Sequence, residues 1–112
     1  MIQNSIYELL DKGRSREALL ELESLLALPM PKSGFETLER KCTLGACCVE
    51  VGAAVSQTDL VEKGIAFFQE VAGSGHPALD LAALEYNLGN GFKSIHDLGR
   101  RSAKTPFSVA VG

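Results

Sequence analysis

The sequence predicts an all-α fold in which antiparallel helical hairpins stack as a short α-solenoid of about five helices. Apolar residues recur every three or four positions along most of the 112 residues, which is the period of an amphipathic helix. Glycine and proline separate these segments at points where short turns are expected. A Leu-Gly pair occurs at Leu44-Gly45 and again at Leu88-Gly89, which indicates an internal repeat.

Composition places the chain among ordinary globular proteins. Hydrophobic residues make up 46% and charged residues 22% of the sequence, and the length fits one domain. The net charge of -3 argues against a general nucleic-acid binder. No apolar run approaches the roughly 20 residues of a membrane span, no signal peptide is visible, and the three cysteines are an odd count. We therefore expect a cytoplasmic protein with free thiols and neither a membrane nor a nucleic-acid partner.

The first two helices form a predicted hairpin. Residues 2–12 and residues 15–28 carry apolar side chains at helical spacing, and Gly13 between them tolerates the left-handed conformation of a helix end. The hydroxyl of Ser15 is expected to cap the second helix, and Pro29 to stop it. The second helix has one apolar stripe, made of Ala18, Leu19, Leu22, Leu25 and Leu26.

A long third helix is predicted after Ser33, since Ser33 and Glu36 have the spacing of a capping box. It should reach residue 53 or 55. Its inward face is built of small residues that suit close approach of a neighbour: Leu38, Cys42, Gly45, Val49 and Gly52. A glycine inside a helix costs about 1 kcal/mol relative to alanine, so packing must offset that cost, or Gly52 marks the helix end.

The fourth helix is predicted over residues 60–72 with Thr58 as its cap, and the fifth from Pro77 to residue 98, ending at Gly99. The inward residues of the fourth are expected to be Leu60, Gly64, Phe67, Phe68 and Val71. Those of the fifth are expected to be Leu84, Leu88, Phe92 and Ile95, with Gly89 beside them as a point of close approach.

Residues 99–112 are expected to form an irregular tail, because Thr105-Pro106 should break a helix and the residues after it have weak extended character. Residues 1–98 then form the helical domain, and we interpret the tail as the cut end of a longer protein. A sixth helix to cover the fifth is missing, so the tail, a partner chain or further sequence would have to cover it.

The segment Leu88-Gly89-Asn90-Gly91-Phe92, preceded by Tyr86-Asn87, resembles helix A of the tetratricopeptide repeat family. The resemblance covers about residues 2–98 and is degenerate. The middle unit is long, the first unit lacks Leu-Gly, and the last lacks its helix B.

That resemblance implies a protein–protein interaction module, because the A helices of the family line a groove that holds a peptide or a helix. Carried over by motif, the groove-facing residues are Glu39, Cys42, Ala46, Val49, Glu50, Tyr86, Asn90 and Lys93. The partner would be a protein or peptide. The alternative is a self-associating structural or regulatory N-terminal segment of a larger protein, with a homodimer formed through the uncovered fifth helix.

Catalysis and metal binding are both disfavoured, so we expect neither an enzyme nor a bound cofactor. The sequence has no Cys-x-x-Cys pair, and adjacent Cys47 and Cys48 point about 100° apart on a helix. Cys48 with His96 is the only nucleophile–base candidate. Cys48 holds the packing position that matches Phe92, so a role in the core is favoured. The glutamates of the third helix are interpreted as ordinary charges on its solvent-exposed surface, not as an acid–base pair.

Overall fold

The computed structural model describes residues 2–30, 34–77 and 79–111. Helices account for most of these residues and no strand occurs among them, which confirms the all-α fold class. Within the described ranges there are five helices: α1 Ile2–Asp11, α2 Ser15–Leu26, α3 Gly34–Ala54, α4 Thr58–Gly73 and α5 Leu81–Val111.

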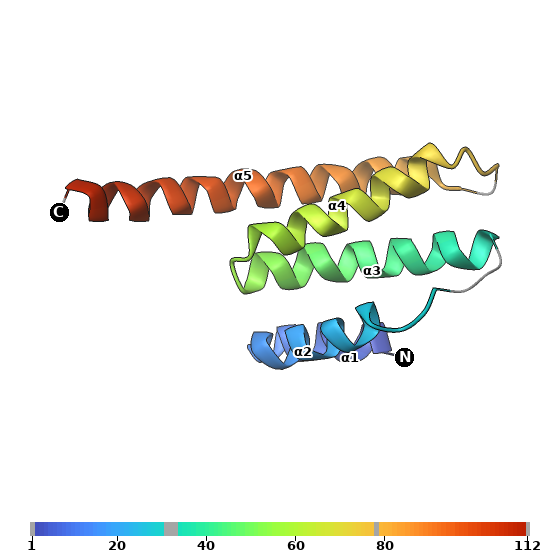
Figure 1. Ribbon diagram of the computed structural model, residues 1–112, viewed down its shortest axis with the longest axis horizontal. Coiled ribbons are helices and arrows are strands. Elements are labelled where there is room, and N and C mark those ends of the chain that lie inside the picture. The colour runs from blue at the N-terminus through green and yellow to red at the C-terminus, as the bar shows by residue number, and fades with distance from the viewer. Residues whose placement is uncertain (1, 31–33, 78, 112) are drawn as a thin grey trace.

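Helix α3 is the centre of the arrangement, because it is the one helix that contacts all four others. Helices α3 and α5 run in the same direction and α4 runs back antiparallel to them, whereas α1 and α2 lie on the far side of α3 from α5 (Figure 1). The molecule is elongated, with extents of 54 × 27 × 21 Å. Successive helices therefore stack side by side as the hairpin pattern predicted.

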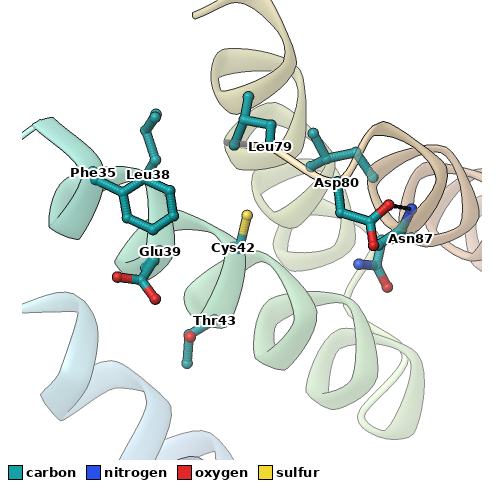
Figure 2. Close-up of a pocket in the computed structure, with 10 residues that line it drawn as sticks. Phe35, Leu38, Glu39, Cys42, Thr43, Leu79, Asp80 and Asn87 are labelled. Atoms are coloured by element: carbon teal, nitrogen blue, oxygen red, sulfur yellow. Dashed lines mark hydrogen bonds between the residues drawn. The ribbon is translucent and has the colours of Figure 1, made fainter. Parts of the chain in front are cut away.

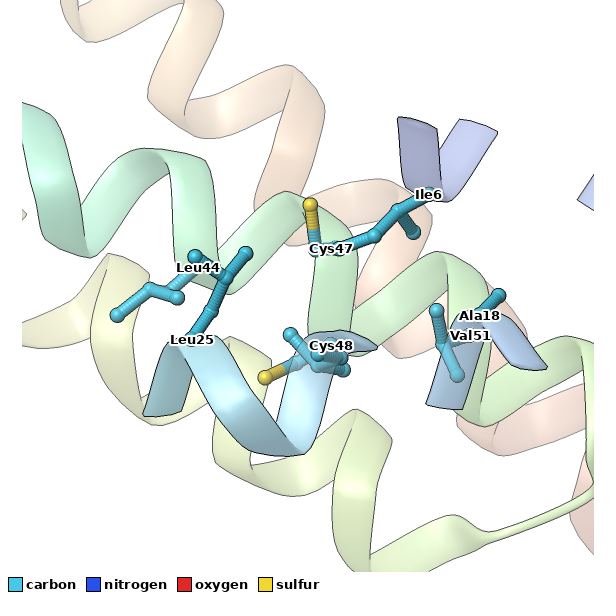
Figure 3. Packing of buried hydrophobic residues seen from close by; sticks show 8 residues of the cluster. Ile6, Ala18, Leu25, Leu44, Cys47, Cys48 and Val51 are labelled. Carbon is cyan, nitrogen blue, oxygen red and sulfur yellow. The ribbon is translucent and has the colours of Figure 1, made fainter. Parts of the chain in front are cut away.

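Two apolar clusters hold the stack together, one on each side of α3. The first joins α1 and α2 to α3 (Figure 3) and contains Ile6, Ala18, Leu22, Leu25, Leu44, Cys47, Cys48 and Val51. The second joins α3, α4 and α5 and contains Val49, Val61, Ile65, Phe68, Val71, Leu84 and Leu98. Each fully buried valine, leucine, isoleucine or phenylalanine contributes roughly 1.5–3 kcal/mol relative to an exposed one.

The first two helices follow the prediction closely. Ala18, Leu22 and Leu25 are buried, and Leu19 and Leu26 pack against the first cluster. Helix α4 was predicted less completely. Leu60 and Phe67 pack against the first cluster, whereas Gly64, Phe68 and Val71 are buried together with two residues that the prediction missed, Val61 and Ile65. Helix α4 therefore contributes to both clusters.

Glycines let α3 and α4 approach backbone to backbone. A Cβ atom added to Gly64 would lie 2.6 Å from the carbonyl oxygen of Gly45 and 2.8 Å from Cγ2 of Val49. A Cβ on Gly52 would lie 2.7 Å from Cγ2 of Val61. These distances are shorter than real Cβ contacts, so glycine is required here. The predicted close packing along Gly45 and Gly52 is therefore confirmed.

The corresponding prediction for Gly89 is wrong. A Cβ on Gly89 would meet nothing within 4 Å, whereas a Cβ on Gly91 would lie 2.6 Å from Cγ1 of Ile65 on α4. Phe92 was expected to pack inward, yet 53% of its surface is exposed. The reason is helical rotation: residues 84, 88, 91, 95 and 98 form one stripe, and Phe92 lies about 100° from Gly91 on the wheel.

The end of α1 has the hydrogen bonds of a Schellman motif. Gly13 has φ +75°, its N–H donates to the carbonyl of Leu10 (3.0 Å), and the N–H of Arg14 donates to the carbonyl of Leu9 (2.8 Å). The left-handed glycine is thus confirmed. The predicted cap at Ser15 is wrong, because Arg14 holds the N-cap position and makes no side-chain capping bond.

The α3–α4 turn uses the same motif with serine in place of glycine. Ser56 has φ 57°, its N–H donates to Ala53, and the N–H of Gln57 donates to Gly52 (2.9 Å). Thr58 is the first residue of α4 and Gln57 is its N-cap, so the predicted cap at Thr58 is also wrong. The capping box at Ser33 lies outside the described residues.

Helix α5 begins later and ends later than predicted. Its true N-cap is Asp80, whose Oδ1 accepts the N–H of Ala83 (3.0 Å), so Pro77 precedes the helix. The backbone stays helical through Gly99 to Val111, and the expected helix end at Gly99 and irregular tail are wrong. A glycine costs about 1 kcal/mol inside a helix, which does not end one. The division between residues 1–98 and 99–112 as domain and tail stays a prediction.

Candidate functional site

A groove of about 340 Å³ lies between the N-terminal part of α3 and the N-terminal part of α5 (Figure 2). Helix α3 forms one wall, and the segment that leads into α5, with its first two turns, forms the other. The residues that line it are Phe35, Leu38, Glu39, Cys42, Thr43, Leu79, Asp80, Ala83, Leu84 and Asn87.

Most of the lining is apolar, and the packing of the second cluster positions it. Leu84 is buried in that cluster, and Leu38, Cys42 and Leu79 pack against it. The side chains of Leu38 and Cys42 extend from α3, with Leu79 on the opposite wall (Figure 2). The base of the groove is therefore continuous with the core, which fixes the spacing of the two walls.

Among the described residues that line the groove there are two carboxylates and no cationic side chain. The Asp80 carboxylate is already bound at the N-terminus of α5 through Ala83. Glu39 is exposed and forms no ion pair within the described ranges. Burial, and then the negative charge of Glu39, raise the pKa of the Cys42 thiol. The groove thus combines an apolar base with a negative rim.

One lining residue of the groove, Phe35, makes an aromatic contact with His76. The rings of Phe35 and His76 meet edge to face, with centroids 5.1 Å apart. His76 lies in the segment between α4 and α5, so this contact ties that segment to the first turn of α3.

The structure separates the eight predicted groove residues into three groups. Glu39 and Cys42 line the groove. Ala46 and Asn90 are half-buried and Glu50, Tyr86 and Lys93 are exposed, but none of these five lines it.

Val49 is a correction, because it is buried and belongs to the second cluster. Its Cγ2 lies 2.8 Å from the Cβ position of Gly64 and 3.6 Å from that of Gly91. It therefore fills the junction of α3, α4 and α5 and is closed to a partner.

The motif carry-over missed the groove residues of the second wall: Leu79, Asp80, Ala83, Leu84 and Asn87. The missed signal was Asp80, a strong N-cap residue directly before an apolar-periodic run. Starting the helix there places Ala83 and Asn87, at i and i+4, on the face toward α3. The family pattern instead directed attention to residues 86, 90 and 93.

The buried cysteines do not form a reactive site. Burial raises the pKa of Cys47 to about 11 and that of Cys48 to about 12, so both are thiols at neutral pH. Their sulfurs point in different directions inside the first cluster (Figure 3). His96 is exposed on α5, so the candidate pair of Cys48 and His96 is not brought together. In the described part of the chain, no three His, Cys, Asp or Glu side chains gather as metal ligands.

Comparison with known proteins yields no relative: no family model, curated protein or solved structure matches this chain. None of the helices in the described ranges is both long enough and apolar enough to cross a bilayer.

Proposed function

We propose that this chain is a protein–protein interaction module that binds a peptide or a helix in the groove between α3 and α5. The tetratricopeptide resemblance supports this proposal. It implies two parallel A helices with an antiparallel B helix packed against both, and α3, α5 and α4 have that arrangement (Figure 1). The observation that carries the proposal is the groove itself, a preformed hollow of about 340 Å³ between two parallel helices.

The chemistry of the lining defines what would bind. A volume of this size lies at the lower end of small-ligand pockets, so it admits one or two side chains of a peptide. The apolar base around Leu38 and Leu84 suits an aliphatic or aromatic anchor. The rim with Glu39 and Asp80 favours a lysine or arginine beside that anchor. The mode is a helix or extended segment lying in a groove.

The test is selection of peptides from a displayed random library on the full chain, followed by titration of the selected peptides. Ala83→Trp fills the groove and should abolish binding. Ala82→Trp is the matched control, because Ala82 is its exposed neighbour and does not line the groove. Selected peptides that bind Ala83→Trp as tightly as the unmodified chain would refute the groove as the site.

A second pair of variants tests the charge preference. Glu39→Lys reverses the charge of the exposed carboxylate on the rim and should weaken the binding of cationic peptides about tenfold, the factor that corresponds to about 1.4 kcal/mol. Glu36→Lys makes the same charge change one turn earlier on α3, at an exposed position outside the groove. Equal loss in both variants would mean that only net charge matters.

The alternative of a self-associating segment is favoured by a separate observation, the large apolar residues exposed along α5. Leu81 and Phe92 are 62% and 53% exposed.

A further inference from the structure

Helix α5 carries a second face that neither the core nor the groove uses. Glu85, Gly89, Phe92 and His96 recur at i, i+4, i+7 and i+11 and all four are exposed, so they form one stripe along the helix. We call these four residues the α5 outer stripe. The groove residues Ala83 and Asn87 lie two positions before Glu85 and Gly89, about 200° away around the helix.

The outer stripe has the two features of a packing surface, a protruding aromatic ring and a notch. Phe92 is 53% exposed, and Leu81, one turn before Glu85, is 62% exposed. Gly89 leaves open space, because a Cβ there would meet nothing within 4 Å. Helix α5 is the outermost helix on its side of the stack, and its C-terminal part extends past α3 and α4 (Figure 1).

We propose that the α5 outer stripe is the interface of a homodimer in which the α5 helices of two copies pack antiparallel. The spacing of the stripe, four then three then four residues, is symmetric about the midpoint between Gly89 and Phe92. An antiparallel copy therefore places Phe92 of each chain against Gly89 of the other, and Glu85 of each chain opposite His96 of the other. Both contacts occur twice, as a two-fold axis requires.

Charge complementarity selects this occupant and this direction. In the antiparallel register an acidic side chain faces an imidazole at both ends of the contact. In a parallel register Glu85 would face Glu85, His96 would face His96, and two Phe92 rings would compete for one place. A shallow crossing of about 20°, with ridges into grooves, keeps the two Glu85–His96 pairs within reach along the helices.

The dimer leaves both peptide grooves open, because the outer stripe and the groove lie on opposite faces of α5. It stands independently of the proposed groove function. If the groove and the dimer proposals are both correct, each dimer presents two grooves. It then binds a ligand that carries two copies of the peptide more tightly than one chain does. A contact made through one pair of helices is small, so a dissociation constant of roughly micromolar or weaker is expected.

Sedimentation equilibrium of the full chain over a range of concentrations tests the proposal. A monomer–dimer equilibrium is expected, and Phe92→Asp should raise its dissociation constant at least about tenfold. Tyr86→Asp is the matched control, since Tyr86 is 71% exposed on α5 but lies off the stripe. A monomer at every concentration, or equal loss in both variants, would overturn the proposal. Far-UV circular dichroism checks that each variant is folded.

Charge exchange tests the register. Glu85→Lys and His96→Glu should each weaken the dimer, and the double variant should restore it, because each new lysine then faces a new glutamate. Failure of the double variant to dimerise again would overturn the antiparallel pairing.

Gly89→Lys is a further test, in which thermal stability and dimer affinity should change in opposite directions. It should raise the melting temperature, because lysine favours a helix over glycine, while it weakens the dimer by filling the notch. A dimer unaffected by Gly89→Lys would also overturn the register.

Discussion

Replacing Gly64 by alanine should destabilise the fold, although alanine is the better helix former. The added Cβ would lie 2.6 Å from the carbonyl oxygen of Gly45, which is backbone and cannot rotate away. An ordinary contact begins at 3.4 Å, so α3 and α4 would have to separate by about 0.8 Å at this point. A gap of 0.5–1 Å forfeits roughly a quarter to a half of each dispersion contact along the interface.

The expected magnitude follows from two opposing effects. Overpacking of this kind costs typically about 1–3 kcal/mol, occasionally more, and the glycine-to-alanine change in a helix returns about 1 kcal/mol. Because the clash involves backbone and also Cγ2 of Val49 at 2.8 Å, we take the upper part of the range and expect a net loss of about 2 kcal/mol. That loss lowers the melting temperature by roughly 4–8 °C per kcal/mol.

The measurement is urea unfolding followed by circular dichroism at 222 nm, at a low protein concentration at which a weak dimer is dissociated. Gly89→Ala is the matched control, because it makes the same change inside a helix where a Cβ meets nothing within 4 Å. It should stabilise by up to about 1 kcal/mol. If Gly64→Ala stabilises the chain as Gly89→Ala does, the close backbone approach of α3 and α4 is refuted.

Four further predictions concern the turns, the reactivity of the thiols, the titration of Cys48 and a helix cap. Gly13→Ala should cost about 1 kcal/mol and Ser56→Gly should gain about 0.5–1 kcal/mol in urea unfolding, since both positions have positive φ; the same sign for both would contradict the turn geometry. Cys42 should react with a thiol reagent in the folded chain, whereas Cys48, which is buried, should react only after unfolding. The pKa of Cys48 is raised from 9.0 to about 12, so the stability due to its protonated form is complete below pH 9 and falls as pH rises toward 12. The stability of Cys48→Ala should fall less steeply over this pH range. An equal slope in both proteins would contradict the assignment of the fall to Cys48. Asp80→Ala should cost about 1 kcal/mol in thermal unfolding and Asp80→Asn much less, because asparagine retains the capping oxygen.

The helical class, the order of the helices and much of the core could be predicted from the sequence. The stripe of Ala18, Leu22 and Leu25 was predicted because one helix face was uniformly apolar, and that face is buried. The left-handed residue at Gly13 was predicted because glycine is the residue that adopts it without strain. These are local properties, and the residues that determine them lie within a few positions of one another.

The candidate site was predicted only in part, for two separate reasons. On α3, Glu39 and Cys42 line the groove, whereas Ala46 and Glu50 do not and Val49 is buried in the second cluster. On the other wall the prediction depended on a family register, and the residues that line the groove are Leu79, Asp80, Ala83, Leu84 and Asn87. The rotation of α5 about its axis is fixed by where Gly91 meets Ile65 of α4, a contact between residues that no local pattern relates.

The sequence by itself determined that this chain folds as helices joined by short turns, because amphipathic period, glycine and proline act over single turns of backbone. The tertiary structure alone decided which glycine permits close approach. The close approach occurs at Gly91, which faces Ile65, and not at Gly89, which faces open space, although the Leu-Gly repeat indicated Gly89. The physical reason is that a missing side chain matters only where another backbone or side chain occupies its volume, and that volume is defined by the neighbouring helix.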